Sequence, residues 1–74
     1  MNEVYFEIIK HIGVIDRLPS GWTKEVNLVS WNGGVAKIDI RDWDSSHERM
    51  TRGITLYEDD AKTLVKNLIE YFEI

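Results

Sequence analysis

Residues 22–43 decide the fold: they read WTKEVNLVSW, then NGG, then VAKIDIRDW. The central Asn32-Gly33-Gly34 is typical of a hairpin turn, because asparagine and glycine tolerate the positive φ angles that tight turns between paired strands require. The runs on either side, residues 22–31 and 35–43, are rich in β-branched and aromatic residues and alternate apolar with polar positions. The segment therefore predicts two antiparallel strands joined by a short turn.

Two further strands are predicted outside this hairpin. Residues 4–15 alternate as a long half-buried strand does, interrupted at Lys10, with these residues on one face: Val4, Phe6, Ile8, Ile12 and Val14. Residues 16–21 contain a proline and a glycine and are expected to form a connection. After the hairpin, residues 44–51 are polar and form a loop, and residues 52–56 form a short strand that begins near Gly53.

The C-terminal segment predicts a helix over residues 58–72. Its apolar positions recur at spacings of three and four residues, which is the stripe of an amphipathic helix: Ala61, Leu64, Val65, Leu68 and Phe72. Three acidic residues, 58–60, occupy the first turn, where the helix dipole favours negative charge. The expected architecture is an α+β fold of order ββββα in a single domain, residues 1–74.

Composition limits the classes of function. The chain has 74 residues, 43% hydrophobic and 30% charged, and no cysteine. A core this small, without disulfides, gains from a partner subunit, so we expect an oligomer. No apolar run is long enough to span a membrane, and we expect a cytoplasmic protein without a membrane partner.

The net charge of −4 does not exclude a nucleic-acid ligand. Residues 1–56 carry a net charge of only −1, and residues 57–74 carry −3. A basic surface on the predicted sheet is therefore compatible with an acidic chain.

The expected turn assigns the side chains of the hairpin to two faces. A tight turn of even length places on one face Trp22, Lys24, Val26, Leu28, Ser30, Val35, Lys37, Asp39, Arg41 and Trp43. The helix is expected to cover the opposite face, which holds Val29, Trp31, Ala36, Ile38 and Ile40. A bulge at Gly33 or Gly34 would exchange the two faces.

The first of these faces combines tryptophans with cations. Lysine and arginine pair with phosphates while aromatic rings stack on unpaired bases, a chemistry suited to single-stranded nucleic acid. Trp31 falls on the other face and is expected to be structural. Two alternatives remain open: the tryptophan face docks a protein partner, and Arg41 forms a salt bridge with an acid such as Asp39.

An enzymatic role is not expected. An acidic cluster with one histidine lies within residues 39–48, but as a calcium loop beginning at Asp42 it has His47 where glycine is required and Gly53 where glutamate is required. The chain has no phosphate-binding glycine loop and no nucleophile motif. We expect no cofactor, no metal and no small-molecule substrate.

Several ordered blocks resemble a known family. The blocks GWTKEVN (residues 21–27), SWN (30–32), KIDIRDW (37–43) and RGITL (52–56) are similar to the bacterial YdbC-like branch of the transcriptional positive cofactor four family. The resemblance extends over nearly the whole chain. It implies a strongly curved four-stranded antiparallel sheet and a helix, paired into a homodimer through the helices, with sheets that bind single-stranded DNA with little sequence preference.

The resemblance also suggests the contact residues. It implies DNA contacts by Trp22, Lys24, Lys37, Arg41, Trp43 and Arg52, with Arg49 in the loop as a weaker candidate; Lys10 extends the same surface if the first strand lies beside the second. RNA is not excluded as a ligand. The basic, serine-rich region of the eukaryotic members is absent here, so the resemblance implies the binding module without a coactivator role.

Overall fold

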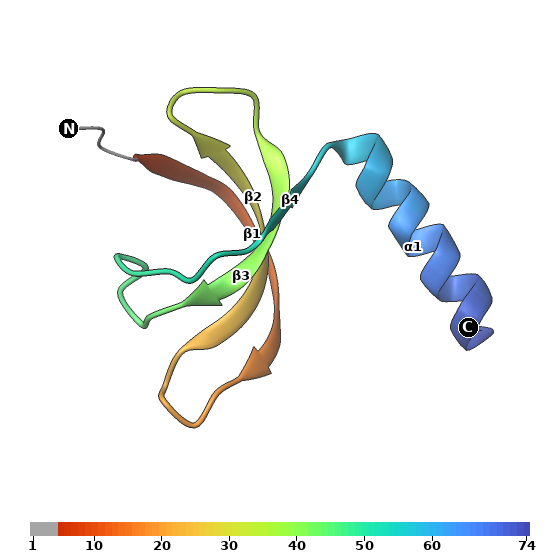
Figure 1. Cartoon of the computed structure of the whole chain (residues 1–74), viewed down its shortest axis with the longest axis horizontal. Helices are drawn as coiled ribbons and strands as arrows, with labels where there is room; N and C mark the ends of the chain where they lie inside the picture. Colours follow the sequence, from red (N-terminus) through yellow and green to blue (C-terminus); the bar gives the residue numbers. More distant parts are fainter. Residues whose placement is uncertain (1–4) are drawn as a thin grey trace.

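The structure is a computed structural model that describes residues 5–74. Four strands, β1 (Phe6–Arg17), β2 (Thr23–Trp31), β3 (Lys37–Trp43) and β4 (Ile54–Leu56), precede one helix, α1 (Glu58–Phe72). The strands form an open antiparallel sheet in the order β1-β2-β3-β4 (Figure 1). The predicted α+β fold of order ββββα is confirmed. Val4, the predicted first residue of β1, lies outside the described residues.

Strand β1 is bent by three irregularities. Its 12 residues pair with the nine of β2, and the pairing register shifts at each of three isoleucines, Ile9, Ile12 and Ile15. A bulge inserts one residue and bends the strand. On the inner side of the bend, every third residue of β1 therefore pairs with β2: Ile8, His11, Val14 and Arg17. The strict alternation predicted for this segment is wrong beyond Ile8.

The hairpin between β2 and β3 has a five-residue connection, residues 32–36. Asn32 and Gly33 have φ angles of 52° and 75°, as the sequence predicts, and the Gly34 N–H donates to the Trp31 carbonyl at 2.9 Å. The next pairs place Val29 opposite Lys37 and Glu25 opposite Arg41, so odd positions face odd positions. The predicted pairing of even with odd positions is wrong, because the turn contains one residue more than an even turn allows.

The sheet consequently has two unlike faces. The concave face, on the inside of the bend in Figure 1, carries Phe6, Ile8, His11, Val14, Arg17, Thr23, Glu25, Asn27, Val29, Trp31, Lys37, Asp39, Arg41 and Trp43. Among the described residues, the fully buried positions all lie on this face, and only Val29 and Trp43 of them are hydrophobic. The convex face carries Val26, Leu28, Ile38, Ile40, Ile54 and Leu56.

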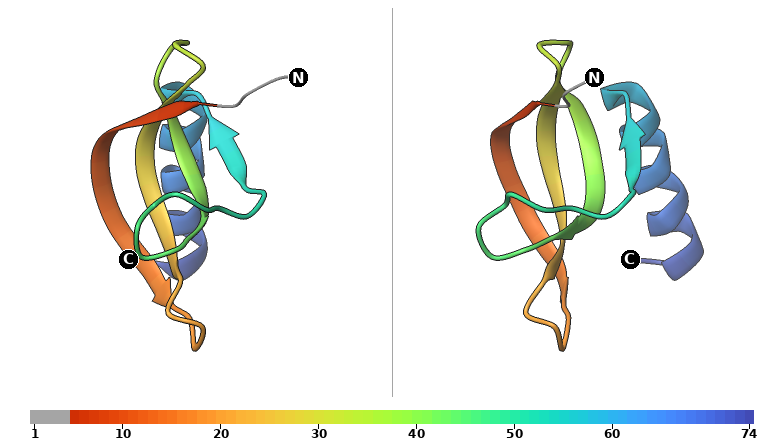
Figure 2. Two further views of the ribbon diagram at one scale, coloured as in Figure 1. Left: turned by 90° about the vertical axis from the view of Figure 1, so that its left-hand side faces the viewer. Right: turned by 60° about the vertical axis from the view of Figure 1, so that its left-hand side comes forward.

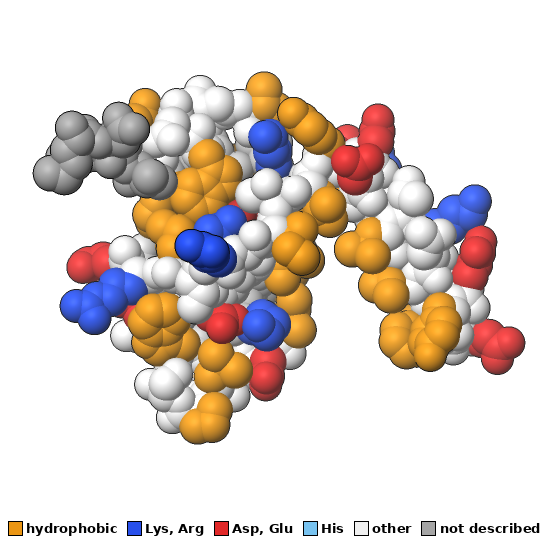
Figure 3. All heavy atoms as spheres, viewed as in Figure 1, with side chains coloured by type: hydrophobic (Ala, Val, Ile, Leu, Met, Phe, Trp, Pro, Cys, Tyr) orange, Lys and Arg blue, Asp and Glu red, His pale blue; other side chains and the backbone are white. Residues whose placement is uncertain are grey.

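The helix stands on the convex side of the sheet, whereas residues 44–53 cross the concave side (Figure 2). No residue of α1 is buried, and of the sheet it touches only β3 and β4. The radius of gyration is 13.5 Å, compared with about 11 Å expected for a compact chain of this length. The expectation that α1 covers a face containing Val29 and Trp31 is wrong. Figure 3 shows hydrophobic side chains on both sides of the space between helix and sheet.

Within residues 5–74, no helix combines the length and apolar character needed to cross a bilayer.

Candidate nucleic-acid interface

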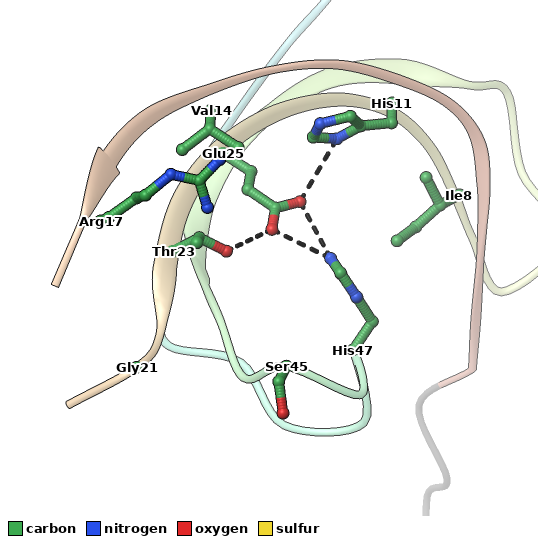
Figure 4. Close-up of a pocket in the computed structure, with 9 residues that line it drawn as sticks. All are labelled: Ile8, His11, Val14, Arg17, Gly21, Thr23, Glu25, Ser45 and His47. Atoms are coloured by element: carbon green, nitrogen blue, oxygen red, sulfur yellow. Dashed lines mark hydrogen bonds and ion pairs between the residues drawn. The ribbon is translucent and has the colours of Figure 1, made fainter.

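The centre of the concave face is a buried carboxylate, that of Glu25. Thr23 Oγ1 and Asn27 Nδ2 donate to its oxygens, the latter at 3.1 Å, and His47 Nε2 lies 3.0 Å from both oxygens. His11 Nδ1 approaches it at 3.4 Å from β1 (Figure 4). The Glu25 side chain is only 3% exposed. The carboxylate therefore joins β1, β2 and the loop between β3 and β4.

Hydrogen bonds keep Glu25 ionised. Burial raises the pKa of this carboxyl, but the hydrogen bonds from Thr23, His47 and Asn27 together outweigh burial and leave the pKa lowered. The negative charge is thus retained inside the concave face, where the two histidines face it.

A pocket of about 470 Å³ opens beside this cluster. Its walls come from β1, β2 and the loop, and they comprise Ile8, His11, Val14, Arg17, Gly21, Thr23, Glu25, Ser45 and His47 (Figure 4). The exposed polar side chains of the pocket, those of Arg17, His11, His47 and Ser45, are all able to donate hydrogen bonds. The pocket is therefore open to a ligand with acceptor atoms.

Arg41 is fixed by a buried partner. Its Nε and Nη2 donate to the two oxygens of Asp39 at 2.6 and 2.7 Å, and Asp39 is fully buried. Its Nη1 donates to the Thr51 carbonyl at 3.3 Å, and the guanidinium carbon lies 4.5 Å from the Trp31 ring centroid. The salt bridge named above as the alternative for Arg41 is present, and the guanidinium retains few free donors.

The tryptophans differ in exposure. Trp43 is fully buried and lies between the rings of Phe6, at 5.0 Å, and His47, at 5.6 Å. It offers no open ring face to a base in this conformation. Trp31, expected on the other face, lies on the concave side, 5.7 Å from Phe6. Trp22 precedes β2 and is half-buried, and its backbone N–H donates to Ser20 Oγ.

The remaining predicted contact residues divide between the two faces. Arg49 and Arg52 are exposed in the segment that crosses the concave side, and Lys37 begins β3 with its ammonium 4.8 Å from the Tyr57 ring centroid. Lys10 lies opposite Leu28, and Lys24 bonds Asp42 at 2.8 Å, which places both on the convex face. The structure therefore does not bring all the predicted cations together.

The segment over the concave face is held by its own side chains. Asp44 Oδ1 accepts from the backbone N–H groups of Glu48 and Arg49 at 2.9 and 3.0 Å, and these bonds, that of Arg49 foremost, lower the pKa of Asp44. At the other end, a Cβ on Gly53 would collide with the Ile40 carbonyl oxygen and with Arg41 Cβ. Only glycine permits this close approach.

Sequence reasoning missed the roles of Glu25 and His11, because the bulges of β1 decide which of its side chains face inward. His47 was identified as a loop residue, but its contact with Glu25 depends on the hairpin register. Among the described residues, no three histidine, cysteine or acidic side chains are grouped as a metal ion requires.

The fold and this face define a small α+β domain with an open, curved sheet, and comparison with known proteins identifies its family. Residues 18–67 match the family described as Transcriptional Coactivator p15 (PC4), and the chain belongs to this family. The family is known for binding single-stranded DNA and for transcription coactivation. An uncharacterized protein of Treponema pallidum (strain Nichols) is 33% identical over 55 residues, which are 74% of this chain and 65% of that protein.

Proposed function

We propose that this chain is a non-enzymatic, cytoplasmic protein that binds single-stranded DNA on the concave face with little sequence specificity, as a homodimer. The observation that carries the proposal is the family match, because residues 18–67 include β2, β3, β4 and the exposed arginines of the crossing segment. RNA is a further possible ligand, since phosphates and unpaired bases are common to both nucleic acids. Transcription, replication and repair all expose the single strands that such a protein would bind.

The proposed contacts follow from exposure. Arg49, Arg52 and Lys37 supply charge for phosphates, and the half-buried ring of Trp22 supplies a surface for a base. Arg41 contributes less to phosphate binding, because Asp39 occupies two of its donors and offsets its charge. Trp43 does not contact DNA directly in this proposal; it stabilises the concave face by packing against Phe6 and His47.

The proposed dimer follows from the uncovered apolar surface. The stripe of α1 is open, with Val65 at 55% and Phe72 at 59% exposure, and Ile54 of β4 is 59% exposed on the convex face. Apolar surface of this extent is unusual on a small monomer. The helix of a second copy, lying between α1 and the convex face, would cover both.

The test is fluorescence anisotropy of a labelled twenty-nucleotide oligothymidine at two salt concentrations, with duplex as competitor. The double variant R49E/R52E is expected to bind more weakly and to reduce the salt slope by about 1.4, since each phosphate contact contributes about 0.7 on a single strand. The control is K62E/K66E, which reverses two charges on the helix, where Lys62 is 71% exposed.

Binding that duplex does not displace, and that R49E/R52E weakens far more than K62E/K66E does, supports the proposal. Absence of binding at low salt refutes it. In that case the alternative function, docking of a protein partner on the concave face, takes its place, and its affinity is expected to respond little to salt.

A further inference from the structure

Both histidines of the chain meet at one buried carboxylate. The sequence contains two histidines, His11 on β1 and His47 in the segment after β3, and both face Glu25. Their imidazoles are 51% and 38% exposed, so each has one side toward Glu25 and another toward the pocket. Histidine is the side chain whose ordinary pKa, about 6.5, lies in the range of pH that cells experience.

The hydrogen bonds fix which ring nitrogens carry protons. His47 Nε2 lies 3.0 Å from two carboxylate oxygens, which only accept, so this nitrogen is the donor. Asn27 Nδ2 donates to Glu25, which orients the Asn27 oxygen toward His11 Nδ1 at 2.7 Å. His11 Nδ1 is therefore also a donor. The other two ring nitrogens, His11 Nε2 and His47 Nδ1, have no hydrogen-bond partner among residues 5–74.

The pocket beside the imidazoles suits an anion once these nitrogens are protonated. Arg17, on the same wall, forms no ion pair or hydrogen bond within the described part of the chain, and Ser45 adds a hydroxyl. The one negative group of the pocket, Glu25, is 3% exposed and already bonded through both oxygens. When both imidazoles are protonated, the pocket therefore presents three positive groups to a ligand, where it presents only Arg17 when they are neutral.

We propose that this pocket, formed by Arg17, His11 and His47, is a phosphate site for the nucleic-acid backbone that becomes fully active on mild acidification. The inference rests on the proposed function, because the phosphate belongs to a strand bound on the same concave face. It adds a regulated contact that the sequence did not indicate, and one of the strands that form it, β1, lies entirely outside the matched family segment.

The charges around the imidazoles support this direction. Glu25 of β2 faces both rings, Arg17 of β1 shares their pocket, and Arg41 of β3 lies opposite Glu25 with its charge neutralised by Asp39. The crossing segment contributes four more charged residues, Asp44, Glu48, Arg49 and Arg52. The lowered pKa of Glu25 keeps this carboxylate charged at mildly acidic pH.

The sign of the effect follows from linkage. A bound phosphate stabilises the charged form of an imidazole beside it, so binding takes up protons. Affinity therefore rises as the pH falls. Each histidine whose pKa rises by one unit on binding contributes about tenfold in affinity once the pH is well below the ordinary value.

The test compares oligothymidine affinity at about pH 7.5 and about pH 5.5, on either side of the ordinary histidine pKa. The wild type is expected to bind about tenfold to a hundredfold more tightly at the lower pH, with a steeper salt slope. The matched variant is H11N/H47Q. Asparagine and glutamine place an N–H where His11 Nδ1 and His47 Nε2 donate, but they do not titrate, so the fold is retained and the gain is expected to disappear.

The outcomes separate the two proposals. Binding at both pH values with equal affinity, or an undiminished gain in H11N/H47Q, overturns the phosphate site while leaving the proposed function. Where no oligothymidine binds at either pH, the proposed function fails, and inorganic phosphate becomes the probe for the pocket. NMR titration of the two imidazole rings then decides: raised pKa values in phosphate support the site, and unchanged values overturn it.

Discussion

Replacing Trp43 by alanine distinguishes a structural tryptophan from a base-stacking one. The sequence predicted a stacking ring, whose loss lowers affinity by about 1–3 kcal/mol and leaves the fold intact. In the structure the side chain is fully buried against Phe6 and His47. Removing a buried tryptophan costs about 3–5 kcal/mol of the free energy of unfolding. At roughly 0.05–0.15 kcal/mol per residue, a chain of 74 residues has about 4–11 kcal/mol in total, so much of the stability is expected to be lost.

Urea unfolding followed by far-ultraviolet circular dichroism, at one fixed protein concentration, measures this loss. W43A is expected to shift the midpoint strongly downward with little change in slope. The control is W22A, because Trp22 is half-buried just before β2 and its truncation removes less buried surface. If W43A instead retains the wild-type midpoint and loses only DNA affinity, the ring is exposed in solution and the packing argument is refuted.

Three other substitutions follow from the concave face. G53A is expected to lower Tm by roughly 5–20 °C in a thermal melt, because the added Cβ collides with Ile40 and Arg41; an unchanged Tm would contradict the close approach. D39A leaves the Arg41 guanidinium unpaired and is expected to cost about 3–5 kcal/mol in urea unfolding, whereas D39A/R41M is expected to recover part of it. The pKa of Glu25 is lower in the folded protein than in the unfolded chain, so this carboxylate stabilises the fold above the unfolded pKa, and the stabilisation is lost as the pH falls through the folded pKa. The wild type is therefore expected to lose stability below about pH 4.5 more steeply than E25Q does. Parallel pH profiles of the two proteins would contradict this.

The sequence predicted the elements well because their signals are local. The stripe from Ala61 to Phe72 has helical spacing, and Asn32 and Gly33 adopt the positive φ angles expected of them. Neither inference depends on distant residues. The helix has no side-chain cap at Tyr57, because tyrosine is not one of the residues that favour the cap position.

The assignment of faces failed because it depends on one residue in the turn. With an odd number of residues, five, connecting β2 and β3, Trp31 and Val29 join Arg41 and Trp43 on one face, and the sequence left this exchange open. The bulges of β1 had a signal, the recurrence of isoleucine every third residue at Ile9, Ile12 and Ile15, but alternation masked it. The contacts of Glu25 depend on both features, so no motif could have predicted them.

The burial pattern ties folding to assembly. Among residues 5–74, the concave face buries three polar side chains, Glu25, Asn27 and Asp39, and only two hydrophobic ones, so this face alone supplies little hydrophobic stabilisation. The apolar convex face and the stripe of α1 remain open in one chain. We therefore expect stability to depend on protein concentration, with about 1.4 kcal/mol gained per tenfold increase for a dimer that unfolds as it dissociates. L68D, on the stripe, is expected to yield unfolded or monomeric chain by sedimentation. A midpoint independent of concentration, together with an intact L68D monomer of wild-type stability, would show that a single chain is stable with its apolar surface exposed.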